Sequence, residues 1–169
     1  MILLKEFKKR VPNYSVKYKE ILFETISNTG GGSAESKSYL GKHFENNYEL
    51  YSYAFWIGII NDRRIEFSPG DKKVNFSHAI ENWGRKTNSR RQNFDWIQNA
   101  IFILCFNRSD IDLIALDKGE IAIKSVVDKL ILTLEEFTYG GLELLSVEFE
   151  DKDGAISEGF FADFLFAEF

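Results

Sequence analysis

The sequence predicts an all-α, single-domain helical bundle of five to seven helices, and three observations lead to this prediction. Several segments repeat apolar residues at the 3.6-residue period of a helix. The chain has only two prolines but sixteen phenylalanines among its 169 residues, a balance that favours long, well-packed elements over loops. Its hydrophobic content of 44% is enough to bury a substantial core in a chain of single-domain size. One domain over residues 1–169 is therefore expected.

The first two helices are predicted on either side of a glycine-rich segment. Residues 16–27 form an amphipathic helix whose apolar face comprises Tyr18, Ile21, Leu22 and Ile26. Residues 29–41 are small and polar and are expected to form a mobile loop. They lack the Gly-Lys-Ser/Thr that a phosphate-binding loop requires. Residues 44–60 are the strongest helix, because apolar residues cover almost every face beyond Leu50, as is typical of a central helix.

The middle of the chain is predicted to contain a turn and up to three further helices. Ser68-Pro69-Gly70-Asp71 has the composition of a turn, and residues 76–83 are expected to form a short helix. Ser89 and Gln92 have the spacing of a capping box. The helix that they would open carries an apolar stripe of Phe94, Ile97, Ile101, Leu104 and Cys105. Residues 109–116 fit either a short helix or a buried strand.

The last third of the chain is predicted to be helical. Residues 121–138 form a helix with a core stripe of Ile123, Val127, Leu130 and Leu134. Gly140-Gly141 is expected to interrupt it, because each Gly is about 1 kcal/mol less favourable than Ala in a helix, and residues 142–149 either resume the helix or alternate as a strand. Residues 159–169 are expected to form a final Phe-rich helix. Its stripe either caps the bundle or docks on a partner or a second copy, and consists of Phe160, Phe161, Phe164 and Leu165.

Charge is divided unevenly along the chain. Residues 1–109 contain 17 Lys and Arg against 11 Asp and Glu, a balance of +6. Residues 110–169 contain 4 against 15, a balance of −11, and the sum is the net charge of −5. This division indicates either that the two regions meet different partners or that they pair with each other inside the fold.

The densest group of cations lies between residues 63 and 91, where eight Lys and Arg accompany three acids. Phosphate contacts beside an aromatic platform, an acidic protein partner and a plain solvated face all remain open. Arg90 and Arg91 fall in the first turn of a predicted helix, where the helix dipole disfavours cations. The candidate binding residues for nucleic acid or an acidic partner are Arg63, Arg64, Lys72, Lys73, Trp83, Arg85, Lys86, Arg90 and Arg91.

No catalytic, metal or cofactor site is predicted with any strength. Cys105 lies in an apolar run typical of a buried residue, and His43 and His78 stand outside any metal-ligand spacing. Asp71 and Lys73 match the second half of a metal-dependent nuclease signature, in which the acid binds Mg²⁺ and the lysine steadies a water. The upstream acid would be Glu49, Asp62 or Glu66. The favoured hypothesis is that the chain is not an enzyme and uses no cofactor.

A cytoplasmic location with no membrane partner is expected. The apolar stretch at the N-terminus is too short for a secretory signal, and no run approaches the ~18 apolar residues of a membrane span. A single cysteine excludes a disulfide framework within the chain.

Two stretches carry a resemblance to a known family. Residues 54–64 read Ala-Phe-Trp-Ile-Gly-Ile-Ile-Asn-Asp-Arg-Arg, and residues 136–145 read Glu-Phe-Thr-Tyr-Gly-Gly-Leu-Glu-Leu-Leu. They resemble the apolar helix with a basic pair and the aromatic helix with a Gly-Gly step of Dnd system-associated protein 4, a small family that accompanies bacterial DNA phosphorothioation (Dnd-type) gene clusters. The likeness covers about residues 44–150. It departs after the basic pair, where this chain has Ile65-Glu66-Phe67 in place of a Pro/Leu-containing stretch.

The resemblance implies an accessory protein of anti-phage defence that works beside larger DNA-handling enzymes, and it implies no catalytic residues. The favoured function is therefore a non-enzymatic accessory or interaction subunit of a multiprotein bacterial system, with a protein partner. A small DNA-binding protein that uses residues 63–91 is the second hypothesis, and the metal-dependent nuclease is the third. The oligomeric state stays open.

Overall fold

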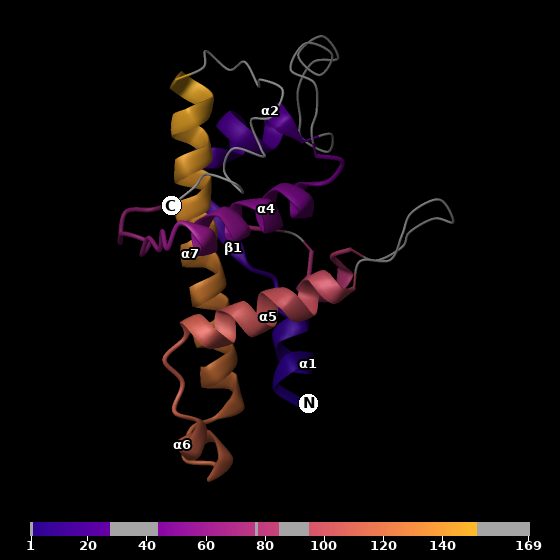
Figure 1. Cartoon of the computed structure of the whole chain (residues 1–169), viewed down its shortest axis with the longest axis vertical. Helices are drawn as coiled ribbons and strands as arrows, with labels where there is room; N and C mark the ends of the chain where they lie inside the picture. Colours follow the sequence, from indigo (N-terminus) through magenta and orange to yellow (C-terminus); the bar gives the residue numbers. More distant parts are fainter. Residues whose placement is uncertain (1, 28–43, 77, 85–94, 152–169) are drawn as a thin grey trace, which may run out of the picture. The chain divides into compact units, whose positions relative to one another are not determined.

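The computed structural model describes residues 2–27, 44–76, 78–84 and 95–151, and this part of the chain is mostly α-helical (Figure 1). The predicted fold class is confirmed. The α-helices of the described residues are α1 (Ile2–Lys8), α2 (Glu24–Ile26), α4 (Asn47–Ile60), α5 (Trp96–Arg108), α6 (Leu113–Asp117) and α7 (Ile123–Asp151). The other elements are a π-helix, η1 (Lys19–Phe23), a 3-10 helix, η2 (Ile80–Asn82), and the short strands β1 (Asn13–Ser15) and β2 (Lys73–Asn75).

The chain divides into two compact units. The first unit comprises Met1–Asn13 and Asn75–Glu135, and the second comprises Tyr14–Val74 and Glu136–Phe169. The boundary therefore passes through β1, through β2 and through the middle of α7. The organisation of residues 1–169 as one domain stays a prediction.

The two strands pair with each other in a small sheet. The amide of Val16 donates to the carbonyl of Lys72 at 2.9 Å, and the amide of Phe76 donates to the carbonyl of Pro12 at 2.9 Å. Because the later residue of one strand lies opposite the earlier residue of the other, the pairing is antiparallel.

The core of the first unit forms where α1, α5 and the first half of α7 contribute apolar side chains. Leu3 and Phe7 lie one turn apart on α1 and are both buried. The rings of Phe7 and Phe102 meet edge to face, with centroids 5.4 Å apart, a geometry that aromatic pairs favour. The α7 side chains buried in this unit include Val127, Leu130 and Leu134, as the predicted stripe requires.

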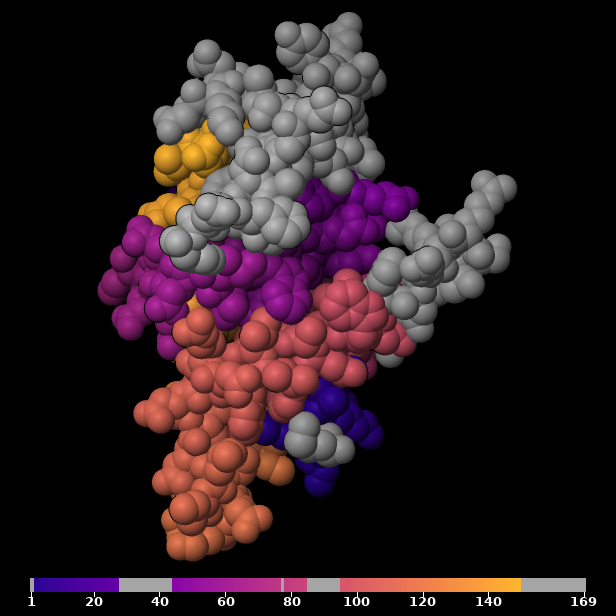
Figure 2. Space-filling model, viewed as in Figure 1, coloured from indigo at the N-terminus to yellow at the C-terminus, as the bar shows by residue number. Residues whose placement is uncertain are grey.

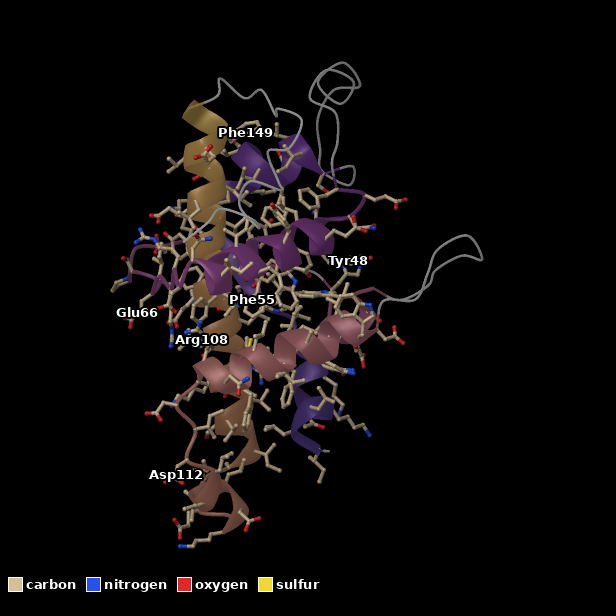
Figure 3. The ribbon with its side chains drawn as sticks, viewed as in Figure 1. Tyr48, Phe55, Glu66, Arg108, Asp112 and Phe149 are labelled. Carbon is tan, nitrogen blue, oxygen red and sulfur yellow. The ribbon has the colours of Figure 1, made fainter. Side chains whose placement is uncertain are left out.

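Helix α4 is buried around most of its circumference, as predicted for a central helix. Its buried residues include Leu50, Phe55 and Ile57, and Phe55 lies midway along it (Figure 3). The carboxylate of Glu49 accepts hydrogen bonds from the amides of Glu45 at 2.8 Å and Asn46 at 3.3 Å. The bond from Asn46 satisfies a donor that the start of a helix leaves unpaired, and the bond from Glu45 holds the residue before it.

Glycines let α4 and the second half of α7 cross with their backbones almost touching. A Cβ on Gly141 would overlap the carbonyl oxygen of Ala54 and lie 2.6 Å from its carbon. A Cβ on Gly58 would likewise overlap the carbonyl of Phe137. Gly140 meets the backbone just beyond α4 in the same way. Only glycine permits this approach, which allows Cα–H groups to face carbonyl oxygens across the crossing.

The predicted interruption at Gly140-Gly141 is therefore wrong. Helix α7 continues without a break from Ile123 to Asp151, as Figure 1 shows, and residues 142–149 are helical rather than a strand. The packing gained at the crossing with α4 outweighs the weak helix propensity of the two glycines.

Three local predictions also need correction. Residues 16–27 do not form one regular helix, because β1 ends at Ser15 and the π-helix η1 follows before α2; the Thr25 hydroxyl bonds the Glu20 carbonyl at 2.8 Å across this wider turn. Of the described residues between 76 and 83, Ile80–Asn82 form the 3-10 turn η2 and Phe76 is held by the strand pairing, so the predicted short helix is wrong there. Helix α1 was not predicted at all.

One open alternative is decided by the structure, and three predicted features lie in segments that it does not describe. Residues 109–116 turn out to include the short helix α6. The capping box at Ser89 and Gln92, the loop at residues 29–41 and the helix at residues 159–169 lie outside the described residues. Helix α5, as far as it is described, begins at Trp96.

Candidate functional site

The first pair of the basic segment, Arg63 and Arg64, is bound to carboxylates of α7. Arg64 donates through Nε to Glu136 Oε2 at 2.8 Å, and its second guanidinium nitrogen lies 2.6 Å from the same oxygen. Glu136 is buried, whereas Arg64 is partly exposed. Arg63 makes the corresponding contacts with Glu143 at 3.0 and 2.6 Å, in a more exposed position. These two arginines hold the segment after α4 against α7, a structural role within the second unit.

Lys72 and Lys73 follow the predicted turn and are exposed. The turn is confirmed, since the amide of Asp71 donates to the carbonyl of Ser68 at 2.9 Å. The ammonium of Lys73 lies 3.8 Å from the centroid of the Phe67 ring, which places it in a cation–π contact.

That contact belongs to a larger group of rings and cations in the second unit. The ring of Phe67 packs on Tyr139 with centroids 4.8 Å apart, and Tyr139 meets Tyr18 at 5.7 Å. The ammonium of Lys17 lies 4.6 Å from the centroid of the Tyr18 ring and 4.7 Å from that of Tyr139. Burial raises the pKa of Tyr18 to about 12, against the opposing effect of Lys17. The rings are thus covered by side chains of the protein itself.

Trp83 is not available as a stacking platform, which corrects the prediction for this residue. It is fully buried in the first unit, where its indole NH donates to the carbonyl of His78 at 3.3 Å and its ring meets Phe76 edge to face. Gln98 Nε2 donates to the Trp83 carbonyl at 2.6 Å. The other predicted cations, Arg85, Lys86, Arg90 and Arg91, lie outside the described residues.

The residues of the nuclease hypothesis have other partners. One oxygen of Asp71 accepts from the Ser68 amide at 2.8 Å and from the Tyr139 hydroxyl at 3.4 Å, and Lys73 lies over Phe67. The Glu49 carboxylate is bound by the amides at the start of α4. Within residues 2–27, 44–76, 78–84 and 95–151, no three His, Cys, Asp or Glu side chains gather as metal ligands do.

Cys105 is completely buried, as predicted. Burial raises the pKa of its thiol far above the ordinary value. A nucleophilic cysteine needs an accessible thiolate, so Cys105 acts as a core residue of the first unit.

Exposed apolar side chains gather at the end of the first unit that contains α6. The carboxylate of Asp112 (Figure 3) accepts from the amides of Ile114 at 3.0 Å and Ala115 at 2.9 Å, which starts the helix. None of the residues of α6 is buried, although Leu113 is 55% exposed and Ile114 is 68% exposed. Figure 2 shows the orange segment that contains α6 at the surface of the molecule.

A groove opens in the same unit between α1 and the first turns of α7. It encloses about 350 Å³ and is lined by Ile2, Glu6, Lys9, Arg10, Ile123, Lys124 and Val127. Its apolar wall is partly exposed: Ile2 is 67% and Ile123 39% accessible. Ile123 was predicted to belong to the core, and it is instead a wall of this groove.

The rim of the groove is mainly cationic. Lys9 pairs with Glu6 at 2.6 Å and Arg10 with Asp128 at 2.6 Å, and the hydrogen bond from Lys9 lowers the pKa of Glu6. Lys124 has no ion-pair partner among the described residues. The sequence carried a signal for α1 that was missed: Leu3 and Phe7 repeat at helical spacing, and Lys5, Lys8, Lys9 and Arg10 stand beside Phe7.

The predicted docking residues Phe160, Phe161, Phe164 and Leu165 lie outside the described residues. In the part of the chain that the structure describes, no helix has the length and hydrophobicity needed to cross a membrane.

The chain matches no protein-family model, and comparison with curated proteins and with solved structures finds no similar protein.

Proposed function

We propose that the chain is a non-enzymatic interaction subunit of a larger bacterial assembly and that it binds another protein through the surface of its first unit. The observation that supports this proposal is the composition of α6. This helix buries none of its residues although three of its five are large and apolar, and two of these, Leu113 and Ile114, are exposed to solvent. Contiguous exposed apolar surface is a common mark of a protein interaction site.

The contacts of the basic segment also favour a protein partner over nucleic acid. Arg63 and Arg64 are engaged by Glu143 and Glu136, and Trp83 is buried. The described part of the segment therefore offers Lys72 and Lys73 for phosphate contacts, and Lys73 already lies over Phe67. The exposed apolar side chains of α6 are explained by a protein partner, whereas nucleic-acid binding would leave them unexplained.

The resemblance of residues 44–150 to Dnd system-associated protein 4 suggests which assembly this is. An accessory protein of anti-phage defence would act near DNA without holding the catalytic groups itself. In this proposal the chain contributes binding surface, and its larger partners carry out the chemistry.

The proposal is tested by affinity capture of the full chain from its native host, followed by quantitative mass spectrometry. Ile114→Ser removes an exposed apolar side chain from α6, and Val147→Ser is the matched control, since Val147 is 51% exposed on α7. We expect Ile114→Ser to lose the captured partner and Val147→Ser to retain it, with both variants folded by circular dichroism. Equal capture by both variants, or no partner in any sample, would contradict the proposal.

A further inference from the structure

We propose that the groove between α1 and the start of α7 receives the acidic, Phe-rich segment of residues 152–169 from a second copy of this chain. This inference rests on the proposed function, because it assigns one partner to the interaction surface of the first unit. It follows from the shape of the groove, the charge of its rim and the composition and reach of the segment.

The groove has the character of a site for apolar side chains. Ile2 on α1 and Ile123 and Val127 on α7 form its apolar wall. Its volume of about 350 Å³ lies at the lower end of the range for binding pockets, about 300–1,000 Å³, and suits side chains of a docked segment better than a large ligand. Exposed isoleucines in such a concave surface gain free energy when a partner covers them.

The charge of the rim selects an acidic partner. Lys9, Arg10 and Lys124 line the groove together with one acid, Glu6, and Asp128 pairs with Arg10 beside it. Helix α1 also carries Lys5 and Lys8, so cations still outnumber acids at the rim. Lys124 has no ion-pair partner among the described residues, so an incoming carboxylate would meet an available ammonium. Opposite charge at an interface speeds encounter and fixes the register of the bound segment.

Residues 152–169 have the matching chemistry. This segment contains five Phe, and its charged residues are Lys152, Asp153, Glu158, Asp163 and Glu168, a net charge of −3. The predicted helix at residues 159–169 would present an apolar stripe flanked by carboxylates, which is how amphipathic helices dock in grooves.

The length of α7 favours a second copy over the chain's own segment. Ile123 and Asp151 are the two ends of one helix, about 42 Å apart at 1.5 Å per residue. If residues 159–169 are helical, seven extended residues and two helical turns bring the stripe only ~35 Å from residue 151. Val127, the groove residue nearest to Asp151, is 24 residues or about 36 Å from it along α7. Even a fully extended linker therefore brings only the end of the stripe to the near edge of its own groove, whereas reciprocal exchange between two copies fills both grooves in a closed dimer.

Sedimentation velocity of the full chain over a concentration series tests the proposal. We expect a monomer–dimer equilibrium that Ile123→Ser weakens by about tenfold, whereas Leu132→Ser leaves it unchanged, because Leu132 is similarly exposed on α7 (42%) but does not line the groove. Lys124→Glu should weaken the dimer in the same way, with Lys118→Glu on the C-terminal side of α6 as its control.

A fluorescent synthetic peptide of residues 152–169 provides a second measurement. It should bind the full chain, bind more weakly as salt is added, and convert the dimer to monomer in excess, while a peptide with the same residues in scrambled order should not. A chain that is monomeric at every concentration overturns the proposal, as does dimerisation that Ile123→Ser and the peptide leave unchanged. Neither result affects capture of another protein through Ile114, so failure of this inference and failure of the proposed function are separate outcomes.

Discussion

Replacing Gly141 by Ala tests whether backbone contact holds α4 and α7 together. In an isolated helix this change would be favourable by about 1 kcal/mol, because Ala has the higher helix propensity. Here the new Cβ would overlap the carbonyl oxygen of Ala54 and lie 2.6 Å from its carbon. The obstacle is the backbone of a buried helix, which cannot rotate away as a side chain could. Overpacking of a core typically costs about 1–3 kcal/mol, so the clash should outweigh the propensity.

We expect Gly141→Ala to lower the free energy of unfolding by roughly 1–2 kcal/mol, and Gly140→Ala/Gly141→Ala to lower it further. Urea unfolding followed by circular dichroism at 222 nm measures the change. Gly70→Ala is the control, because a Cβ there would meet nothing within 4 Å and should leave stability unchanged or slightly raised. If Gly141→Ala proved more stable than the wild type, the crossing would not be as close as described, and propensity alone would govern these positions.

Three further predictions concern buried polar groups. Arg64→Ala should lower stability by roughly 1–3 kcal/mol, since it leaves the buried Glu136 carboxylate without its cation, whereas Arg63→Ala, in the more exposed pair, should cost no more than about 1 kcal/mol; urea unfolding measures both. Cys105 should resist a thiol reagent in the native protein and react once the chain is unfolded in urea, because burial raises the pKa of its thiol. Stability should fall between about pH 10 and pH 12, because the pKa of Tyr18 is raised from 10.0 to about 12 in the folded state, so the native state keeps a proton that the unfolded chain releases; Tyr18→Phe should reduce this loss.

The outcomes that would contradict these predictions are equally specific. Equal losses for Arg64→Ala and Arg63→Ala would mean that burial of Glu136 has no energetic consequence. Rapid labelling of native Cys105 would show that the core of the first unit opens readily. A Tyr18→Phe variant with the alkaline loss of the wild type would assign that loss to other groups.

The sequence patterns predicted best where burial alone determines the structure. The repeat around Leu50 and Phe55 gave α4, and the stripe of Val127, Leu130 and Leu134 gave the first half of α7, because a helix that packs on a core must bury one face. Leu104 was expected in the stripe of α5 and is only half-buried. Such periodicity finds the buried face of a helix but not how completely each residue is covered.

The errors arose where a contact distant in sequence decides the local structure. Gly140 and Gly141 favour a break when only their own segment is considered, and they are retained in a helix because α4 passes directly over them. The ion pairs of Arg63 and Arg64 were likewise not foreseen, because their partners on α7 lie 80 and 72 residues away in the sequence. Trp83 was predicted to be a stacking platform because its neighbouring residues in the sequence do not reveal that other segments bury it.

The continuity of α7 limits which changes of length the chain can accept. One inserted residue advances a helix by about 100° and 1.5 Å. An insertion between Leu134 and Gly140 would therefore turn both glycines away from the backbone of α4 and bring residues with side chains to the crossing, if the earlier stripe kept its place. If the glycines instead kept their place at the crossing, the first half of α7 would have to rotate, and Val127 and Leu130 would become exposed. Related sequences should accordingly vary α7 by substitution rather than by the gain or loss of single residues between these positions.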